Sequence, residues 1–209
     1  MLKDLICQIN NYLDSLPENE RIESINTIRQ AIHTHSPFKR NPIDCILWIK
    51  QEKIIPNNYN PNSVAPQERK LLEKSIKIDG FTQPIVVYPT PEEERFEIVD
   101  GFHRYDIIRR CKSLNKMLNG YLPVSCLAHE ATDSLSRMAS TVRHNRARGR
   151  HQISAMSDIV CEMALQGWDE KRIGAELGMD CDEVLRLRQV SGLLQLFADR
   201  NFSLAWTID

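Results

Sequence analysis

The sequence predicts an α+β domain followed by an all-α domain that contains a helix-turn-helix. Two observations support this fold class. Between residues 44 and 132, short apolar β-branched segments alternate with helical patterns, whereas the β signals stop beyond about residue 133. The chain of 209 residues is long enough for one ample domain or two small ones.

Residues 1–35 are predicted to form a helical extension, with two amphipathic helices interrupted by Pro17. The apolar stripe of the first consists of Leu2, Leu5, Ile6, Ile9, Leu13 and Leu16, and that of the second of Ile22, Ile25, Ile28 and Ile32. Such faces must be buried on the same domain or on another chain, and the former is the more frequent outcome. A linker with Ser36, Pro37 and Asn41-Pro42 follows.

The predicted α+β domain covers residues 44–132. Its expected strands lie at 46–49 with 54–55, at 84–88, at 96–99 and at 124–127. A helix is expected over 66–79, where Gly80 ends it, because glycine readily adopts the left-handed conformation of a helix C-terminus.

The segment Asp100-Gly101-Phe102-His103-Arg104 lies where a strand pattern ends and a helix pattern begins. Glycine at such a corner permits close backbone approach to a ligand, and the first amides of the helix have no partner within it. With His103 and Arg104 added, this corner is a candidate phosphate site. The alternative is an ordinary Asp-Gly turn with solvated charges.

The all-α domain is predicted over 133–200, with helices at 152–166, 169–177 and 181–196. The last two match a helix-turn-helix. In it, Gly174 permits close packing, Gly178 makes the turn, and Val184 and Leu187 anchor the second helix. A structural helical hairpin without a role in DNA binding is the alternative.

Residues 143–151 hold four arginines and two histidines without an acid, a density that favours a polyanion partner. An exposed basic linker is the alternative. Two features oppose simple DNA binding: the net charge is −1, and residues 152–183 contain eight acidic against two basic residues. Three of these acids, Asp180, Asp182 and Glu183, lie where a recognition helix starts and would repel the DNA backbone. The alternative is a structural role, because acids stabilise a helix N-terminus electrostatically.

Composition predicts a cytoplasmic protein. No apolar run approaches the length needed to span a bilayer, and the N-terminus lacks the pattern of a secretory signal. The six cysteines are scattered without a Cys-x-x-Cys pair, which argues against a structural zinc site and a disulfide framework.

The order of these pieces resembles the ParB-like family, whose N-terminal domain shares its fold with sulfiredoxin. The motifs in question are Gln83-Pro84-Ile85-Val86-Val87, the Gly-x-x-Arg corner, the basic run with Asn145 and the helix-turn-helix. The resemblance covers about residues 44–195 and is greatest to the IbrB-like prophage co-activators. It therefore implies a ParB/sulfiredoxin-like domain followed by the helix-turn-helix domain.

In the family, a Gly-Glu-Arg-Arg motif and a Glu-Asn-x-Gln-Arg motif bind the phosphates of CTP with magnesium. The resemblance thus implies a site for a nucleoside triphosphate, CTP or ATP, formed by Gly101, Phe102, His103, Arg104, His144, Asn145, Arg146 and Arg148. No metal site is expected from the protein alone, but Asn145 is a candidate ligand for nucleotide-bound magnesium. Phe102 and His144 replace both glutamates, so hydrolysis is expected to be slow or absent. Phe102 also stands where sulfiredoxin has its nucleophilic cysteine, which excludes that chemistry.

The sequence favours a nucleotide-responsive DNA-binding or transcription co-regulatory protein, associated with prophages or mobile elements. Its expected DNA contacts are Arg143, Arg150, Arg186 and Arg188. The resemblance adds a PAPS-reductase-like partner protein; no membrane partner is expected, and a homodimer remains open. The alternative is an enzyme of the same fold that acts on a nucleotide as an NTPase, phosphotransferase or nuclease.

Overall fold

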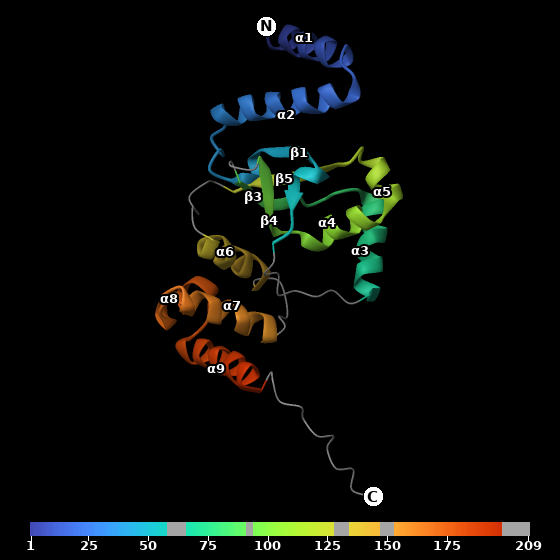
Figure 1. Cartoon of the computed structure of the whole chain (residues 1–209). Helices are drawn as coiled ribbons and strands as arrows, with labels where there is room; N and C mark the ends of the chain where they lie inside the picture. The colour runs from blue at the N-terminus through green and yellow to red at the C-terminus, as the bar shows by residue number, and fades with distance from the viewer. Residues whose placement is uncertain (58–65, 91–93, 128–133, 147–152, 198–209) are drawn as a thin grey trace, which may run out of the picture. The chain divides into compact units, whose positions relative to one another are not determined.

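The computed structural model describes residues 1–57, 66–90, 94–127, 134–146 and 153–197 (Figure 1). The chain separates into two compact units. The first contains residues 1–58 and 64–132, and the second contains 59–63 and 133–209. Within the described ranges, no helix is long and apolar enough to cross a membrane.

The first unit is built on a mixed five-stranded sheet with the strand order β1-β5-β3-β4-β2. Its strands are β1 (Ile46–Lys50), β2 (Ile54–Ile55), β3 (Ile85–Thr90), β4 (Arg95–Asp100) and β5 (Tyr121–Cys126). The pairs β1–β5 and β3–β4 are antiparallel, whereas β3–β5 and β2–β4 are parallel. Every strand predicted from the apolar β-branched segments is therefore present.

Three helices accompany this sheet: α3 (Pro66–Asp79), α4 (Phe102–Arg110) and the short α5 (Lys112–Met117). The bounds of α3 confirm the prediction, and Gly80 follows it at φ 75° with its amide bonded to the carbonyl of Ile76. Apolar side chains of the strands and helices form one core, with Ile85, Val87, Ile98, Ile108, Leu122 and Val124 at its centre. Short 3-10 turns at Pro42–Asp44 and Gln51–Lys53 flank β1.

The N-terminal extension forms α1 (Leu2–Asp14) and α2 (Glu18–His35), with Pro17 at the start of the second helix as expected. Burial of their apolar stripes on the domain was the expected outcome, and the structure contradicts it. No side chain of either helix is buried, and Leu2 is 70% exposed. The stripe of α2 is only partly covered, since Ile22, Ile25 and Ile28 are half-buried whereas Ile32 is 65% exposed, and polar groups of α2 also contact the sheet.

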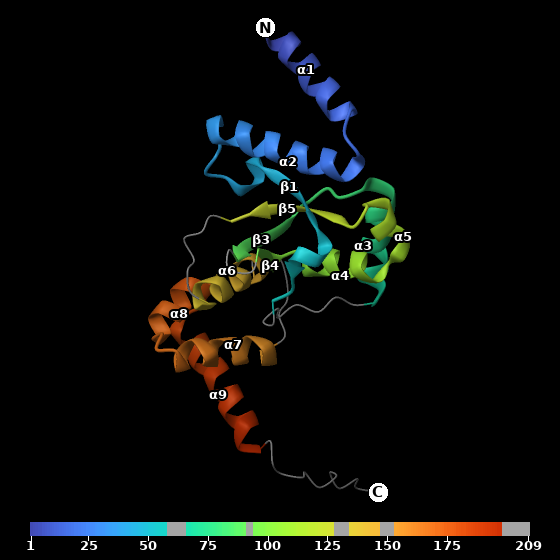
Figure 2. The same cartoon turned by 45° about the horizontal axis from the view of Figure 1, so that its top comes forward.

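These polar contacts satisfy the free edge of β1, beside which α2 lies in Figures 1 and 2. The Asn26 amide donates to the carbonyl of Trp48 at 2.7 Å and accepts from the amide of Trp48 at 2.9 Å. Arg29 donates to the carbonyl of Ile46 at 3.0 Å. An edge strand with open hydrogen-bonding groups invites pairing with another chain, and α2 prevents this.

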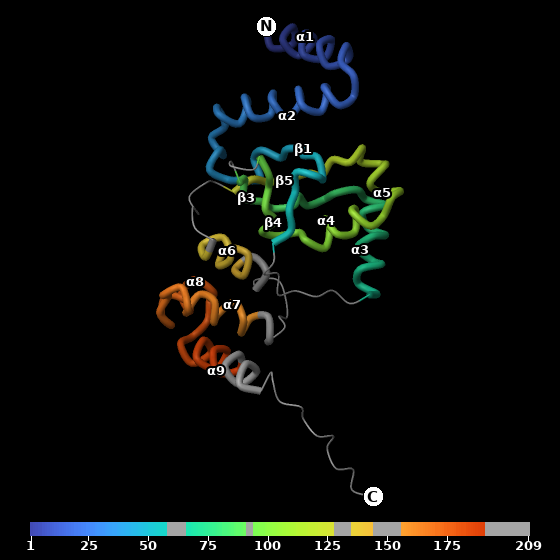
Figure 3. The backbone as a smooth tube through the Cα atoms, in the orientation of Figure 1, coloured from blue at the N-terminus to red at the C-terminus, as the bar shows by residue number. Residues whose placement is uncertain are grey.

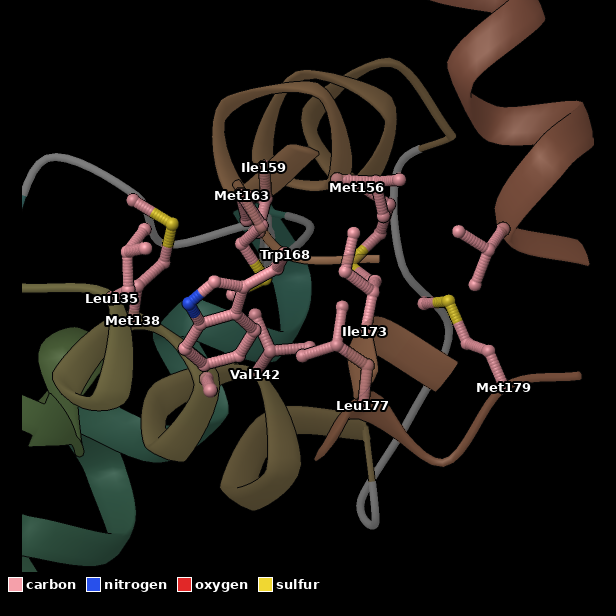
Figure 4. Packing of buried hydrophobic residues seen from close by; sticks show 13 residues of the cluster. Leu135, Met138, Val142, Met156, Ile159, Met163, Trp168, Ile173, Leu177 and Met179 are labelled. Atoms are coloured by element: carbon pink, nitrogen blue, oxygen red, sulfur yellow. The ribbon is translucent and has the colours of Figure 1, made fainter. Parts of the chain in front are cut away.

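The second unit contains α6 (Ser134–Arg146), α7 (Ile153–Leu165), α8 (Glu170–Leu177) and α9 (Cys181–Phe197). The last three were predicted from the sequence, whereas no helix was predicted over the residues of α6. Figure 4 shows Val142 of α6 beside Trp168, Ile173 and Leu177 in a common apolar cluster. Leu135, Met138 and Ala139 of α6 also belong to that cluster, so α6 is needed to complete it.

The helix-turn-helix geometry of α8 and α9 confirms the interpretation of the glycines, and Figure 3 traces the backbone through their short turn. Gly178 adopts φ 67°, and Val184 is fully buried in the cluster. A Cβ atom at Gly174 would lie 2.6 Å from the carbonyl oxygen of Met179. Only glycine therefore allows the turn to approach α8 this closely.

We expect Asn26→Ala to speed amide hydrogen exchange at Trp48, because that amide then loses its acceptor. The local opening free energy should fall by about 1–3 kcal/mol, the cost of unpaired polar groups. Thr27→Ala is the control, since the Thr27 hydroxyl bonds only within α2, to the carbonyl of Glu23. Equal exchange at Trp48 in the Asn26 variant and the wild type would contradict this account of α2.

Gly174→Ala should destabilise the second unit by about 1–3 kcal/mol, because the added methyl group must displace the turn backbone. Urea unfolding followed by the fluorescence of Trp168 measures this change. Gly178→Asn is the matched control, because asparagine tolerates positive φ and no atom lies within 4 Å of that Cβ position. Equal stability of the two variants would show that the packing at Gly174 is not limiting.

Candidate anion-binding corner and candidate nucleic-acid interface

The candidate anion site of the first unit is the corner between β4 and α4. Gly101 joins the two elements at φ 94° and ψ 18°. A Cβ atom there would lie 3.2 Å from Arg104 Nη2 and 3.3 Å from the Cα atom of Ile85. Both the backbone conformation and the space therefore favour glycine, and the first amides of α4 begin directly after it.

Arg104 ties this corner to the end of the turn before β3. Its Nη1 donates to the carbonyls of Gln83 at 2.6 Å and Pro84 at 3.1 Å. Its side chain is only 13% exposed, with Nη2 at 3.9 Å from the Asp100 carboxylate. The guanidinium thus holds together two motifs that are about twenty residues apart in the sequence. Its first role in the structure is to shape the site.

His103 offers a buried nitrogen at the same corner. Its Nε2 is buried and has no hydrogen-bond partner within the described ranges. Burial lowers the pKa of the imidazole, against the opposing charge of Asp106, and thus disfavours the protonated ring. Phe102 instead packs against the apolar core, with its ring centroid 5.8 Å from that of His103.

A carboxylate surrounded by arginines lies next to His103, and the sequence analysis did not identify it. Asp106 is 9% exposed at its side chain and accepts from Arg69 at 2.7 Å and from Arg110 Nε at 2.8 Å, while Arg109 lies at 3.7 Å. One negative charge thus faces three positive charges. The i+3 and i+4 spacing of Arg109 and Arg110 was a signal for this cluster. No sequence signal indicated Arg69, which comes from α3.

The basic run, for which an exposed linker was the alternative, begins inside a helix. Arg143, His144, Asn145 and Arg146 end α6, and only the side chain of Arg143 belongs to the described part of the structure. Arg148 and Arg150 lie outside the described residues. Whether the run and the corner form one site therefore stays a prediction.

Several charges of the second unit are engaged in holding its helices together. Arg143 of α6 pairs with Glu176 of α8, and Arg188 of α9 pairs with Glu170 of α8. Two of the arginines predicted to contact DNA are therefore ion-paired within the protein. The same pairs remove two carboxylates from those available to repel a phosphate backbone.

Two further acids cap helices. The Asp169 carboxylate accepts from the amide of Arg172 at 2.7 Å at the start of α8. Asp180 accepts from the amide of Glu183 at 2.6 Å at the start of α9. Such caps satisfy amides that have no partner within the helix. Asp180 is thus a structural residue, which confirms for this acid the alternative that it stabilises the start of the helix.

The exposed side chains at the start of α9 follow a helical spacing. Asp182, Leu185, Arg186 and Gln189 are exposed at positions i, i+3, i+4 and i+7. They form one solvent-facing stripe opposite the buried Val184. Within the described ranges, Arg186 makes no ion pair, in contrast to Arg143 and Arg188. The Arg186 guanidinium of α9 can therefore contact a phosphate or a base without first breaking an ion pair to a described residue.

Comparison with known families gives two matches. The model described as ParB N-terminal domain matches residues 39–118. The model described as IbrB-like C-terminal HTH domain matches residues 151–199, the segment that contains α7, α8 and α9.

Relatives are similar to this chain over different lengths. The uncharacterized protein YbdM of Escherichia coli (strain K12) is 58% identical over 208 residues, which cover 100% of this chain and 98% of YbdM. A nucleoid occlusion protein of Oceanobacillus iheyensis is 29% identical over 92 residues, or 44% of this chain and 29% of that protein. The C-terminally truncated chromosome-partitioning protein ParB of Caulobacter crescentus, complexed with CTP-gamma-S, aligns with a TM-score of 0.40 and 18% identity. This alignment covers 73% of this chain and 83% of that one.

Proposed function

This chain belongs to the ParB-like family, and we propose that it is a DNA-binding regulatory protein whose first unit binds a nucleoside triphosphate. The observation that carries the DNA-binding part is the helix-turn-helix geometry of α8 and α9. Its turn depends on Gly174, and α9 presents an exposed stripe with Arg186. A recognition helix needs such a face to enter the major groove.

The charges of the second unit support this role better than the acidic composition of the segment suggests. Asp169 and Asp180 cap helices, while Glu170 and Glu176 pair with arginines. At least half of the eight acids are thereby engaged within the unit. On α9, Asp182 remains exposed beside Arg186, and a carboxylate can accept from cytosine whereas a guanidinium can donate to guanine.

The salt dependence of duplex DNA binding tests this assignment. Each arginine–phosphate contact steepens the logarithmic salt slope by about 0.9. We expect Arg186→Ala to flatten the slope by about that amount. Arg188→Ala should change it little, because Glu170 already neutralises this guanidinium. Glu170→Gln should free Arg188 and strengthen binding. Fluorescence anisotropy across a salt series gives all three slopes.

Lys74→Ala is the control for the loss of one positive charge, because Lys74 is an exposed lysine on α3 of the other unit. Equal effects of Arg186→Ala and Lys74→Ala would contradict a DNA-contacting α9. The complete absence of DNA affinity at low salt, with the wild type folded, would make the helix-turn-helix a scaffold or a protein-docking surface.

The nucleotide-binding part of the proposal rests on the corner between β4 and α4. Helix amides, the buried Nε2 of His103 and the arginines around Asp106 lie close to one another there. Phosphate oxygens accept from all three kinds of donor. The family resemblance adds Asn145 and Arg146 to the proposed site, with Asn145 as a ligand of nucleotide-bound magnesium.

Two substitutions separate binding from scaffolding at this corner. His103→Ala should weaken ATP or CTP binding about tenfold, the effect of one lost charge-assisted bond, without lowering the unfolding midpoint. Arg104→Ala should weaken binding and also lower the midpoint, because its hydrogen bonds fix the corner. Calorimetric titration with each nucleotide and magnesium, paired with thermal unfolding, measures both.

Unchanged nucleotide affinity in a folded His103→Ala protein would contradict the role of this nitrogen. Release of inorganic phosphate is measured in the same samples. Negligible release fits the replacement of both family glutamates by Phe102 and His144. Rapid release that Arg104→Ala abolishes would instead favour the enzymatic alternative. Co-purification with a PAPS-reductase-like protein tests the partner that the IbrB-like resemblance adds to the proposal.

A further inference from the structure

A cavity of about 1290 Å³ lies between α2 and the sheet of the first unit, away from the β4–α4 corner. Its lining includes Glu23 and Asn26 of α2, Trp48 and Lys50 of β1, and Tyr121 of β5. The cavity exists because polar contacts hold α2 beside β1 while the helix buries none of its side chains.

Two hydrogen-bond donors face each other across adjacent strands in the lining. Lys50 and Tyr121 are directly opposite in the antiparallel β1–β5 register. Opposite residues point to the same side of a sheet, and so does Trp48, two positions before Lys50. The side chains of Trp48, Lys50 and Tyr121 thus project from one side of the sheet.

The hydroxyl of Tyr121 lacks a partner although the residue is almost completely buried. Tyr121 is 3% exposed, and its oxygen makes no hydrogen bond to any described residue. An unpaired buried hydroxyl is costly, and tyrosines in this position normally have a partner. A bound acceptor would remove this cost.

The charges around the cavity favour an anion as that acceptor. Its cationic side chains are Lys39, Arg40, Lys50 and Lys53, and its acidic side chains are Glu23 and Glu52. Lys53 approaches Glu94 at 3.9 Å, whereas Lys50 has no ion pair within the described ranges. Trp48 and Tyr121, on the same side of the sheet as Lys50, add an aromatic surface for a flat apolar group.

We propose that this cavity binds a small aromatic carboxylate. Its carboxylate accepts from the Lys50 ammonium and the Tyr121 hydroxyl, and its ring packs against Trp48. The proposal is independent of DNA and nucleotide binding, because none of these three residues belongs to the corner or to the second unit. A dry void is not an alternative, because a space of this size with charged and polar lining takes up water or a ligand.

The test uses 1-naphthoate as the probe, with neutral 1-naphthalenemethanol and cationic 1-naphthylmethylammonium as charge controls, on the full-length chain. Calorimetry gives the affinities, and the indole N–H signal of Trp48 in NMR spectra locates the probe. We expect naphthoate to bind at least tenfold more tightly than either control and to shift the Trp48 signal. Tyr121→Phe and Lys50→Gln should each weaken naphthoate binding about tenfold.

Lys74→Gln is the matched control and should bind naphthoate as the wild type does, because it removes a lysine outside the cavity. Tyr121→Phe keeps the ring, so the unfolding midpoint checks that the sheet is intact. Equal binding of the three probes, no binding by the folded wild type, or undiminished binding by both cavity variants would each overturn the proposal.

Discussion

The two hydrogen bonds from Arg104 to the carbonyls of Gln83 and Pro84 are the constraint on which the geometry of the first unit's candidate site depends. They join the turn before β3 to the start of α4, and the guanidinium group of Arg104 occupies the space beside Gly101. Glycine at position 101 and arginine at position 104 are therefore required by the corner itself. The presence of these two residues does not depend on hydrolysis. This explains how the chain keeps the glycine and the last arginine of the family motif while it lacks the glutamates.

The second unit follows the same rule, because charged side chains that suggest ligand binding also hold its helices. Glu170 and Glu176 connect α8 to α9 and α6, and Asp180 caps α9. A count of charges along the sequence consequently overstates the repulsion of DNA by the acids. It equally overstates the attraction by the arginines. DNA binding therefore depends on charges such as that of Arg186, which makes no ion pair within the described ranges.

The sequence predicted the elements well and the interactions between them poorly. Apolar periodicity located the strands and most helices, and Gly80 and Gly178 marked helix ends because their left-handed conformation is costly for other residues. The residues of α6 do have apolar side chains at helical spacing, namely Leu135, Met138, Ala139 and Val142, a pattern that we did not use to predict a helix there. At the corner, the sequence identified His103 and Arg104. It did not reveal Arg69, since a contact across 37 residues depends on the packing of α3 against α4.

The N-terminal hairpin shows why burial is harder to predict than periodicity. The stripes of α1 and α2 are amphipathic, yet α2 attaches through Asn26 and Arg29 to backbone groups of β1. Those bonds hold the helix beside the strand edge, where the apolar stripe of α2 is only half-buried against the sheet. Edge protection and complete burial are therefore competing demands on one helix. The structure satisfies the first, and the cavity follows as its consequence.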